Sequence, residues 1–141
     1  MDNAWLHSSC IYFITDNAAH YCFLGWGKSN YSSDFKRSLQ QVKVPIVSPS
    51  ICENRNNNIF PKVHVSTSHN ICAGFGKDSP EYGCSGDSGG PLLSMSENGQ
   101  WKVDGIMSWG DPSCESDSKD TYTVFTNVAR YEKWISETMV M

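Results

Sequence analysis

The sequence of 141 residues lacks the features that mark several large classes of protein. No apolar run approaches the roughly 20 residues that a membrane-spanning helix needs. No block of lysine and arginine is present and the net charge is -4, so we expect neither nucleic acid nor a membrane as a partner. Residues 1–20 have no basic start and no apolar centre, so we expect no signal peptide there. The length favours a single domain.

Metal-binding and redox motifs are absent as well. No two cysteines have the C-x-x-C spacing, which argues against a zinc ribbon and a thioredoxin-like site, and we expect no metal and no cofactor. An even number of widely spaced cysteines is typical of disulfides formed in an oxidising compartment. Because such a compartment conflicts with the missing signal peptide, we expect the chain to be part of a longer protein. The six are Cys10, Cys22, Cys52, Cys72, Cys84 and Cys114.

Short segments of β-strand character alternate with polar turns along the chain. Many short strands joined by polar loops predict an all-β barrel or sandwich. Pro45 lies inside one segment and marks an edge or a bulge. The strand-like segments are Cys22 to Gly27, Leu39 to Val47, Leu92 to Met95, Trp101 to Trp109 and Thr121 to Val128.

Two helices are expected. Ser48 is a good N-cap and Pro49 suits the first helical position, so a short helix is predicted to begin there. A second helix is predicted to close the chain, because apolar residues repeat there at helical spacing. These are Val128, Tyr131, Trp134, Ile135 and Met139. We also expect Trp26, Trp101 and Trp134 to lie in the core rather than at a ligand site.

The segment from Cys84 to Leu92 carries the strongest chemical signal. It surrounds Asp87 and Ser88 with three glycines, which permit backbone turns that side chains would block. Such a loop can direct several N–H groups toward one point and so stabilise an oxyanion. Ser88 is therefore predicted to be a nucleophile rather than an exposed turn residue.

From Cys10 to Met139 the chain resembles the trypsin/chymotrypsin family of serine endopeptidases. The resemblance rests on the loop around Ser88 and on three further segments in the family's order: Gly25 to Gly27, Ile71 to Gly74 and Ser108 to Gly110. It implies the second, six-stranded barrel of a double β-barrel, followed by a C-terminal helix. Residues 1–21 would be a remnant of the inter-barrel linker, and residues 22–141 the C-terminal half of a peptidase domain.

The resemblance also implies roles for the loop residues. Ser88 would attack the scissile carbonyl, and the backbone N–H groups of Gly86 and Ser88 would form the oxyanion hole. The Asp87 carboxylate would pair with a new N-terminal ammonium after zymogen cleavage, although no activation sequence is present in this chain.

A substrate-binding pocket is implied beside the loop. Ser108, Trp109 and Gly110 would contact the substrate, with Gly110 and Thr123 lining the pocket and Tyr82 at its base. Tyr82 stands where trypsins carry an aspartate, so we expect small or medium apolar substrate side chains rather than Arg or Lys. Because the preceding segment is about one residue longer than usual, Glu81 is the alternative at the base.

The resemblance implies two disulfides, Cys52–Cys72 and Cys84–Cys114, while Cys10 and Cys22 either pair with each other or stay free. It also implies an extracellular, secreted protein that acts on protein or peptide substrates and meets serine protease inhibitors. Asn30 begins an N-glycosylation sequon in a predicted surface loop, and an unmodified asparagine is the alternative.

A serine nucleophile needs a base and an orienting carboxylate, and the chain offers no convincing pair. His7, His64 and His69 are expected to be surface or structural residues, and we attribute the family-like surroundings of His20 and Asp2 to chance. We therefore expect a serine endopeptidase chain that is inactive alone. The alternative is a non-catalytic protease homologue that binds a protein partner.

Overall fold

The structure is a computed structural model that describes residues 10, 21–30, 32–57, 61, 64–76, 83–111, 114 and 120–140. Seven strands form one antiparallel sheet in the order β2-β1-β5-β6-β7-β4-β3. Their bounds are β1 Tyr21–Gly25, β2 Gln40–Val44, β3 Ile46–Val47, β4 Asn70–Ala73, β5 Pro91–Met95, β6 Trp101–Trp109 and β7 Thr123–Asn127.

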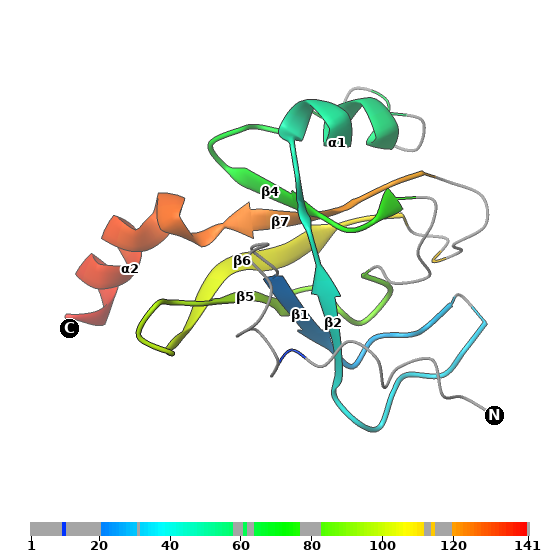
Figure 1. The fold of residues 1–141 in the computed structure, drawn as a ribbon, viewed down its shortest axis with the longest axis horizontal. Helices are drawn as coiled ribbons and strands as arrows, with labels where there is room; N and C mark the ends of the chain where they lie inside the picture. The colour runs from blue at the N-terminus through cyan, green and yellow to red at the C-terminus, as the bar shows by residue number, and fades with distance from the viewer. Residues whose placement is uncertain are drawn as a thin grey trace.

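The sheet curls into a barrel because its two edge strands are consecutive in sequence. Only Pro45 separates β2, at one edge, from β3, at the other. The predicted strand from Leu39 to Val47 is therefore one bent strand, and the seven segments correspond to the six strands expected. Gly74 donates its N–H to the Pro45 carbonyl at 3.0 Å, which ties the bend to the end of β4. The all-β barrel prediction is confirmed (Figure 1).

The hydrophobic core fills the inside of the curled sheet. Phe23 of β1 and Phe125 of β7 meet edge to face, with ring centroids 5.2 Å apart. Such aromatic pairs add about 0.5–1.5 kcal/mol beyond the burial of their area. The rest of the cluster comes from the other long strands: Val42, Val44, Ala73, Leu92 and Met107.

Both predicted helices are present. Helix α1 spans Pro49–Asn56, and the Ser48 side chain accepts the Ile51 N–H as an N-cap should. A 3₁₀ turn, η3 (Val128–Tyr131), leads into α2 (Glu132–Met139), which extends away from the strands (Figure 1). None of the helices in the described part of the chain is long and apolar enough to cross a membrane.

The expectation that three tryptophans lie in the core is wrong. Trp26, Trp101 and Trp134 are 55%, 45% and 64% exposed. Trp26 lies in the turn after β1, Trp101 is the first residue of β6, and α2 has no buried residue at all. Aromatic character and helical spacing predicted burial, but these three positions lie at the periphery of the barrel, where little of the described chain covers them.

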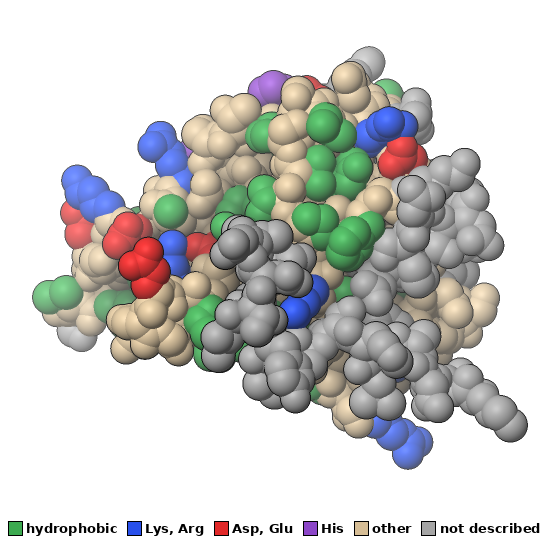
Figure 2. All heavy atoms as spheres, in the orientation of Figure 1, with side chains coloured by type: hydrophobic (Ala, Val, Ile, Leu, Met, Phe, Trp, Pro, Cys, Tyr) green, Lys and Arg blue, Asp and Glu red, His purple; other side chains and the backbone are tan. Residues whose placement is uncertain are grey.

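Figure 2 shows one face of the molecule with hydrophobic side chains near its centre and charged ones around them. Hydrophobic side chains gather over α1 and the neighbouring strands, and acidic and basic ones gather at the α2 end. The half-exposed Ile46 of β3 and Ile51 of α1 are among the exposed apolar residues of the chain. Lys133 and Glu137 form an ion pair one turn apart on α2.

Three disulfides join the elements, and they are the pairs that the sequence suggested. Cys10 pairs with Cys22 of β1, which resolves the alternative left open for these two residues. The Cys52–Cys72 bond fastens α1 to β4. The Cys84–Cys114 bond fastens the serine loop to the segment that follows β6.

Helix α1 is also anchored by a buried amide. The Asn56 side chain, 3% exposed, donates to the Tyr122 carbonyl and accepts the Tyr122 N–H, both at 3.0 Å. Arg55 forms an ion pair with Asp120 beside it. Asn56 thus satisfies both backbone groups of the residue that precedes β7.

We expect Asn56→Ala to lower the free energy of unfolding by about 2 kcal/mol, because both Tyr122 backbone groups lose their partner. The adjacent Asn57 is exposed and provides a matched control. Asn57→Ala should change the free energy of unfolding by under about 0.5 kcal/mol. Urea denaturation of both variants measures the difference. Equal losses would contradict the anchoring role of Asn56.

Candidate functional site

The serine loop runs between β4 and β5 and is built from two tight turns. The Asp87 N–H binds the Cys84 carbonyl at 3.0 Å, and the Gly90 N–H binds the Asp87 carbonyl at 2.8 Å. Gly86 and Gly89 have φ angles of 96° and 82°, in the region that favours glycine. The glycines singled out in the sequence therefore occur where the turns require them.

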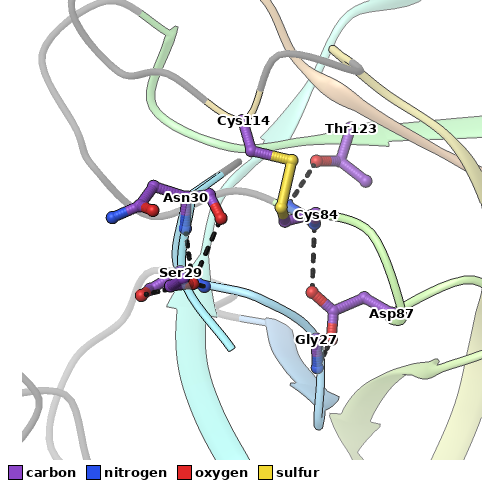
Figure 3. The surroundings of a disulfide bond; sticks show 9 residues. Gly27, Ser29, Asn30, Cys84, Asp87, Cys114 and Thr123 are labelled. Carbon is purple, nitrogen blue, oxygen red and sulfur yellow. Dashed lines mark hydrogen bonds between the residues drawn. A yellow bond between two sulfur atoms is a disulfide. The ribbon is translucent and has the colours of Figure 1, made fainter. Parts of the chain in front are cut away.

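Asp87 holds this loop against the end of β1. Its side chain is 8% exposed, and one carboxylate oxygen accepts the Gly27 N–H at 2.7 Å while the other accepts the Cys84 N–H at 3.0 Å (Figure 3). A Cβ at Gly25 or Gly27 would overlap the carboxylate. Close approach of this carboxylate explains why glycines flank Trp26.

Hydrogen bonds also set the direction of the two backbone N–H groups expected to form the oxyanion hole. In a trans peptide the C=O and N–H point in opposite directions. The Ser85 carbonyl accepts the Lys28 N–H at 3.0 Å, so the Gly86 N–H points away from Lys28. In the same way the Gly90 N–H holds the Asp87 carbonyl and directs the N–H of Ser88. Neither Gly86 N–H nor Ser88 N–H has a hydrogen-bond partner among the described residues.

An open cavity of about 180 Å³ lies beside Ser88. Its lining combines the serine loop with the end of β6 and the residues after it. The lining residues are Gly83, Cys84, Ser85, Ser88, Met107, Trp109, Gly110 and Asp111. The structure thus brings Ser88 together with Trp109 and Gly110, which the sequence associated with substrate binding.

Two other residues expected at the pocket, Ser108 and Thr123, are not among its lining residues. Ser108 is exposed. Thr123 is 4% exposed and lies behind the wall, where its hydroxyl accepts the Gly83 N–H at 3.1 Å. Tyr82 and Glu81, the alternatives for the pocket base, lie outside the described residues.

Met107 is a lining residue that the sequence reasoning missed. A Cβ at Gly83 would lie 2.5 Å from the Met107 methyl carbon and 2.9 Å from its sulfur, so the thioether packs directly against Gly83. Alternation along β6 could not have indicated it, because the strand is irregular between Met107 and Trp109, which lie opposite the adjacent β7 residues Phe125 and Val124. The cavity wall near Gly83 is therefore apolar.

No described histidine contacts Ser88. His64 binds Glu53, with Nδ1 and Oε1 2.7 Å apart. His69 lies near the hydroxyls of Ser66 and Ser68 and accepts from Arg130. His7, His20 and Asp2 lie outside the described residues. Within the described residues, no group of three or more His, Cys, Asp or Glu side chains could hold a metal ion.

Asn30, the candidate glycosylation site, lies in the turn region that follows β1. Its backbone closes a turn with Ser33, and the Asn30 and Ser32 side chains of the sequon are both exposed. The segment adjoins the serine loop through the Lys28–Ser85 hydrogen bond.

Comparison with known proteins agrees with this fold and loop. The profile of the family described as Trypsin matches residues 14–135. The chain is 40% identical to rat chymotrypsin-C over 118 residues, which are 82% of this chain and 41% of that protein. It is 37% identical to human mannan-binding lectin serine protease 1 over 112 residues, which are 79% of this chain and 15% of that protein.

A third relative is transmembrane protease serine 11G of the rat, 35% identical over 111 residues, 79% of this chain and 25% of that protein. The chain belongs to the trypsin family of serine proteases. It spans less than half the length of each of these relatives.

We expect Asp87→Asn to destabilise the chain by about 1–3 kcal/mol, because an amide offers one acceptor oxygen to two N–H groups that the carboxylate satisfies. Asp34→Asn changes an exposed carboxylate on the neighbouring loop and is the matched control. Thermal denaturation compares the two variants. If they melt at the same temperature, the Asp87 carboxylate does not hold the loop.

Proposed function

We propose that this chain carries the nucleophile and the oxyanion hole of a serine endopeptidase, with Ser88 as the nucleophile. The observation that supports it most is that the N–H groups of Gly86 and Ser88 have no partner among the described residues and lie beside a cavity that Ser88 itself lines. Donors that are already oriented stabilise a developing oxyanion without reorganisation during the reaction.

The proposed reaction proceeds through an acyl-enzyme. Ser88 Oγ bonds to the scissile carbonyl carbon and its proton passes to a general base, while the oxyanion accepts the N–H groups of Gly86 and Ser88. The carbon–nitrogen bond then breaks, and the amine leaves with a proton. Water attacks the resulting ester with the help of the base and releases Ser88. No described side chain is hydrogen-bonded to Ser88 to act as that base.

Part of the cavity wall supports a preference for small or medium apolar substrate side chains, although Asp111 also lines the cavity. Met107 and Trp109 contribute apolar surface, and the Thr123 hydroxyl already accepts a hydrogen bond from the Gly83 N–H. As a secreted protease it would act on proteins or peptides and meet protein inhibitors. The disulfides suit that environment, and we include Asn30 as a glycosylation site because its sequon is exposed.

The second candidate is a non-catalytic homologue that binds a protein partner. The observation that favours it is Ser88 without a hydrogen-bonded histidine among the described residues. The two candidates differ in whether Ser88 reacts with an electrophile.

A peptide boronic acid with an alanine-like side chain tests the nucleophile, because serine adds to boron and forms a tetrahedral adduct that resembles the transition state. We expect ¹¹B NMR to detect the adduct in the chain and in Ser85→Ala, which changes another serine of the same wall. The adduct should be lost in Ser88→Ala. Adduct formation in Ser88→Ala, or none in the unmodified chain, would contradict the proposal and favour the binding homologue.

We expect the purified 141-residue chain to hydrolyse peptides no faster than its Ser88→Ala variant at ordinary assay sensitivity. An oxyanion hole without a triad retains only roughly 10³–10⁴-fold catalysis over water. Release of a fluorogenic peptide fragment measures the rate. Rapid hydrolysis that Ser88→Ala abolishes would mean that the chain contains its own base.

A further inference from the structure

Phe35 lies against the glycine that supplies one of the proposed oxyanion donors. A Cβ at Gly86 would lie 2.6 Å and 2.9 Å from the Cε1 and Cδ1 atoms of the Phe35 ring. The ring edge therefore meets the Gly86 backbone with no space for a side chain between them. Yet Phe35 is 60% exposed, so the ring contributes little to the hydrophobic core.

The exposed side of the ring carries a second contact. The Lys28 ammonium lies 5.3 Å from the centroid of the Phe35 ring, within the range of a cation–π interaction. The loop that carries both residues is closed at its base, where the Lys36 N–H binds the Trp26 carbonyl at 3.1 Å. Phe35 is thus held over Gly86 by its own loop.

Gly86 benefits from such a restraint because glycine itself has little preference for one backbone conformation. Glycine populates positive and negative φ about equally, and only one orientation points the Gly86 N–H away from the loop. The Lys28 N–H restrains the peptide bond between Ser85 and Gly86 by binding the Ser85 carbonyl. The ring of Phe35 and the Gly27 Cα together occupy the space where a side chain of residue 86 would lie. Lys28 and Phe35 belong to the same short loop, residues 28–36.

We propose that Phe35 is a positioning residue that holds Gly86 at its positive φ and so keeps the Gly86 N–H directed as an oxyanion donor. The use of that donor rests on the proposed function, whereas the hold on Gly86 does not. Without the ring, the peptide between Ser85 and Gly86 gains freedom to rotate and the donor is present for only part of the time.

NMR of the full chain tests the hold on Gly86 without any need for catalysis. With ¹⁵N-glycine and carbonyl-¹³C-serine labels, only glycines that follow a serine are selected, and these are Gly86 and Gly89. A Ser88→Ala sample identifies the Gly86 signal, because it removes the labelled serine before Gly89. Gly89 then serves as an internal control, since its N–H is bound to the Met107 carbonyl at 3.0 Å.

We expect Phe35→Ala to change the three-bond couplings between the Gly86 N–H and its Hα protons, which report φ, in addition to removing the ring-current shift, while the Gly89 couplings stay the same. Phe35→Tyr, which keeps the ring, should leave both sets of couplings unchanged. Phe75→Ala removes another exposed phenyl group and is the matched control, expected to leave Gly86 unchanged. If Phe35→Ala unfolds the chain, Phe35→Leu keeps apolar volume without the ring and gives the same readout.

The affinity for the peptide boronic acid measures how much the Phe35 contact contributes to the Gly86 N–H as an oxyanion donor. We expect Phe35→Ala to weaken binding about tenfold, less than the roughly 10²–10³-fold effect of removing an oxyanion donor outright, and Phe35→Tyr to restore it. Unchanged Gly86 couplings in Phe35→Ala overturn the positioning role, even where Ser88-dependent binding persists. Changed Gly86 couplings in a chain that binds no boronic acid support the hold on Gly86 and reject the proposed function instead.

Discussion

The buried carboxylate of Asp87 is the interaction on which the rest of the site depends. Its two oxygens accept N–H groups from two segments far apart in sequence, Gly27 after β1 and Cys84 in the serine loop. Hydrogen bonds to an ionised acceptor are roughly twice as strong as neutral ones, and a buried carboxylate without them would be costly. The serine loop can therefore pack on β1 only where this carboxylate fits, which requires glycine at positions 25 and 27.

A series of polar contacts extends this constraint around the cavity. The Thr123 hydroxyl fixes Gly83, and the Cys84–Cys114 disulfide fixes the next residue. On the far side, Asn56 of α1 holds Tyr122, immediately before Thr123. A helix that contributes no atom to the cavity thus positions its wall. Rigid support of this kind keeps donors aligned, which is the condition for electrostatic stabilisation of a transition state.

The site separates two parts of serine protease chemistry. The two N–H groups that we propose as oxyanion donors are oriented in part by hydrogen bonds within the described chain, because the preceding carbonyls of Ser85 and Asp87 are both bonded. Proton transfer is different, since the described histidines bind Glu53 or the Ser66 to Ser68 turn and not Ser88. A base contributes only when it lies within hydrogen-bond reach of the nucleophile. Membership in the trypsin family therefore does not by itself make this chain active, because activity also requires a base near Ser88.

The sequence by itself determined the all-β class, both helices, the edge or bulge at Pro45 and the loop around Ser88, and the family resemblance chose the barrel over the sandwich. These follow from local signals: strand character, an N-cap serine, a proline that cannot donate, and glycines that permit positive φ. The family resemblance added the pairing of Cys52 with Cys72 and of Cys84 with Cys114, and the structure added that of Cys10 with Cys22.

Only the tertiary structure decided which side chains meet across the barrel. Met107 in the cavity wall, the ring of Phe35 on Gly86 and the amide of Asn56 on Tyr122 all join residues far apart in sequence. The same is true of exposure, since Trp26, Trp101 and Trp134 have core-like side chains at positions that the fold leaves open. Such contacts depend on the register and curl of the sheet, which bring distant segments together and leave no periodic signal along the chain.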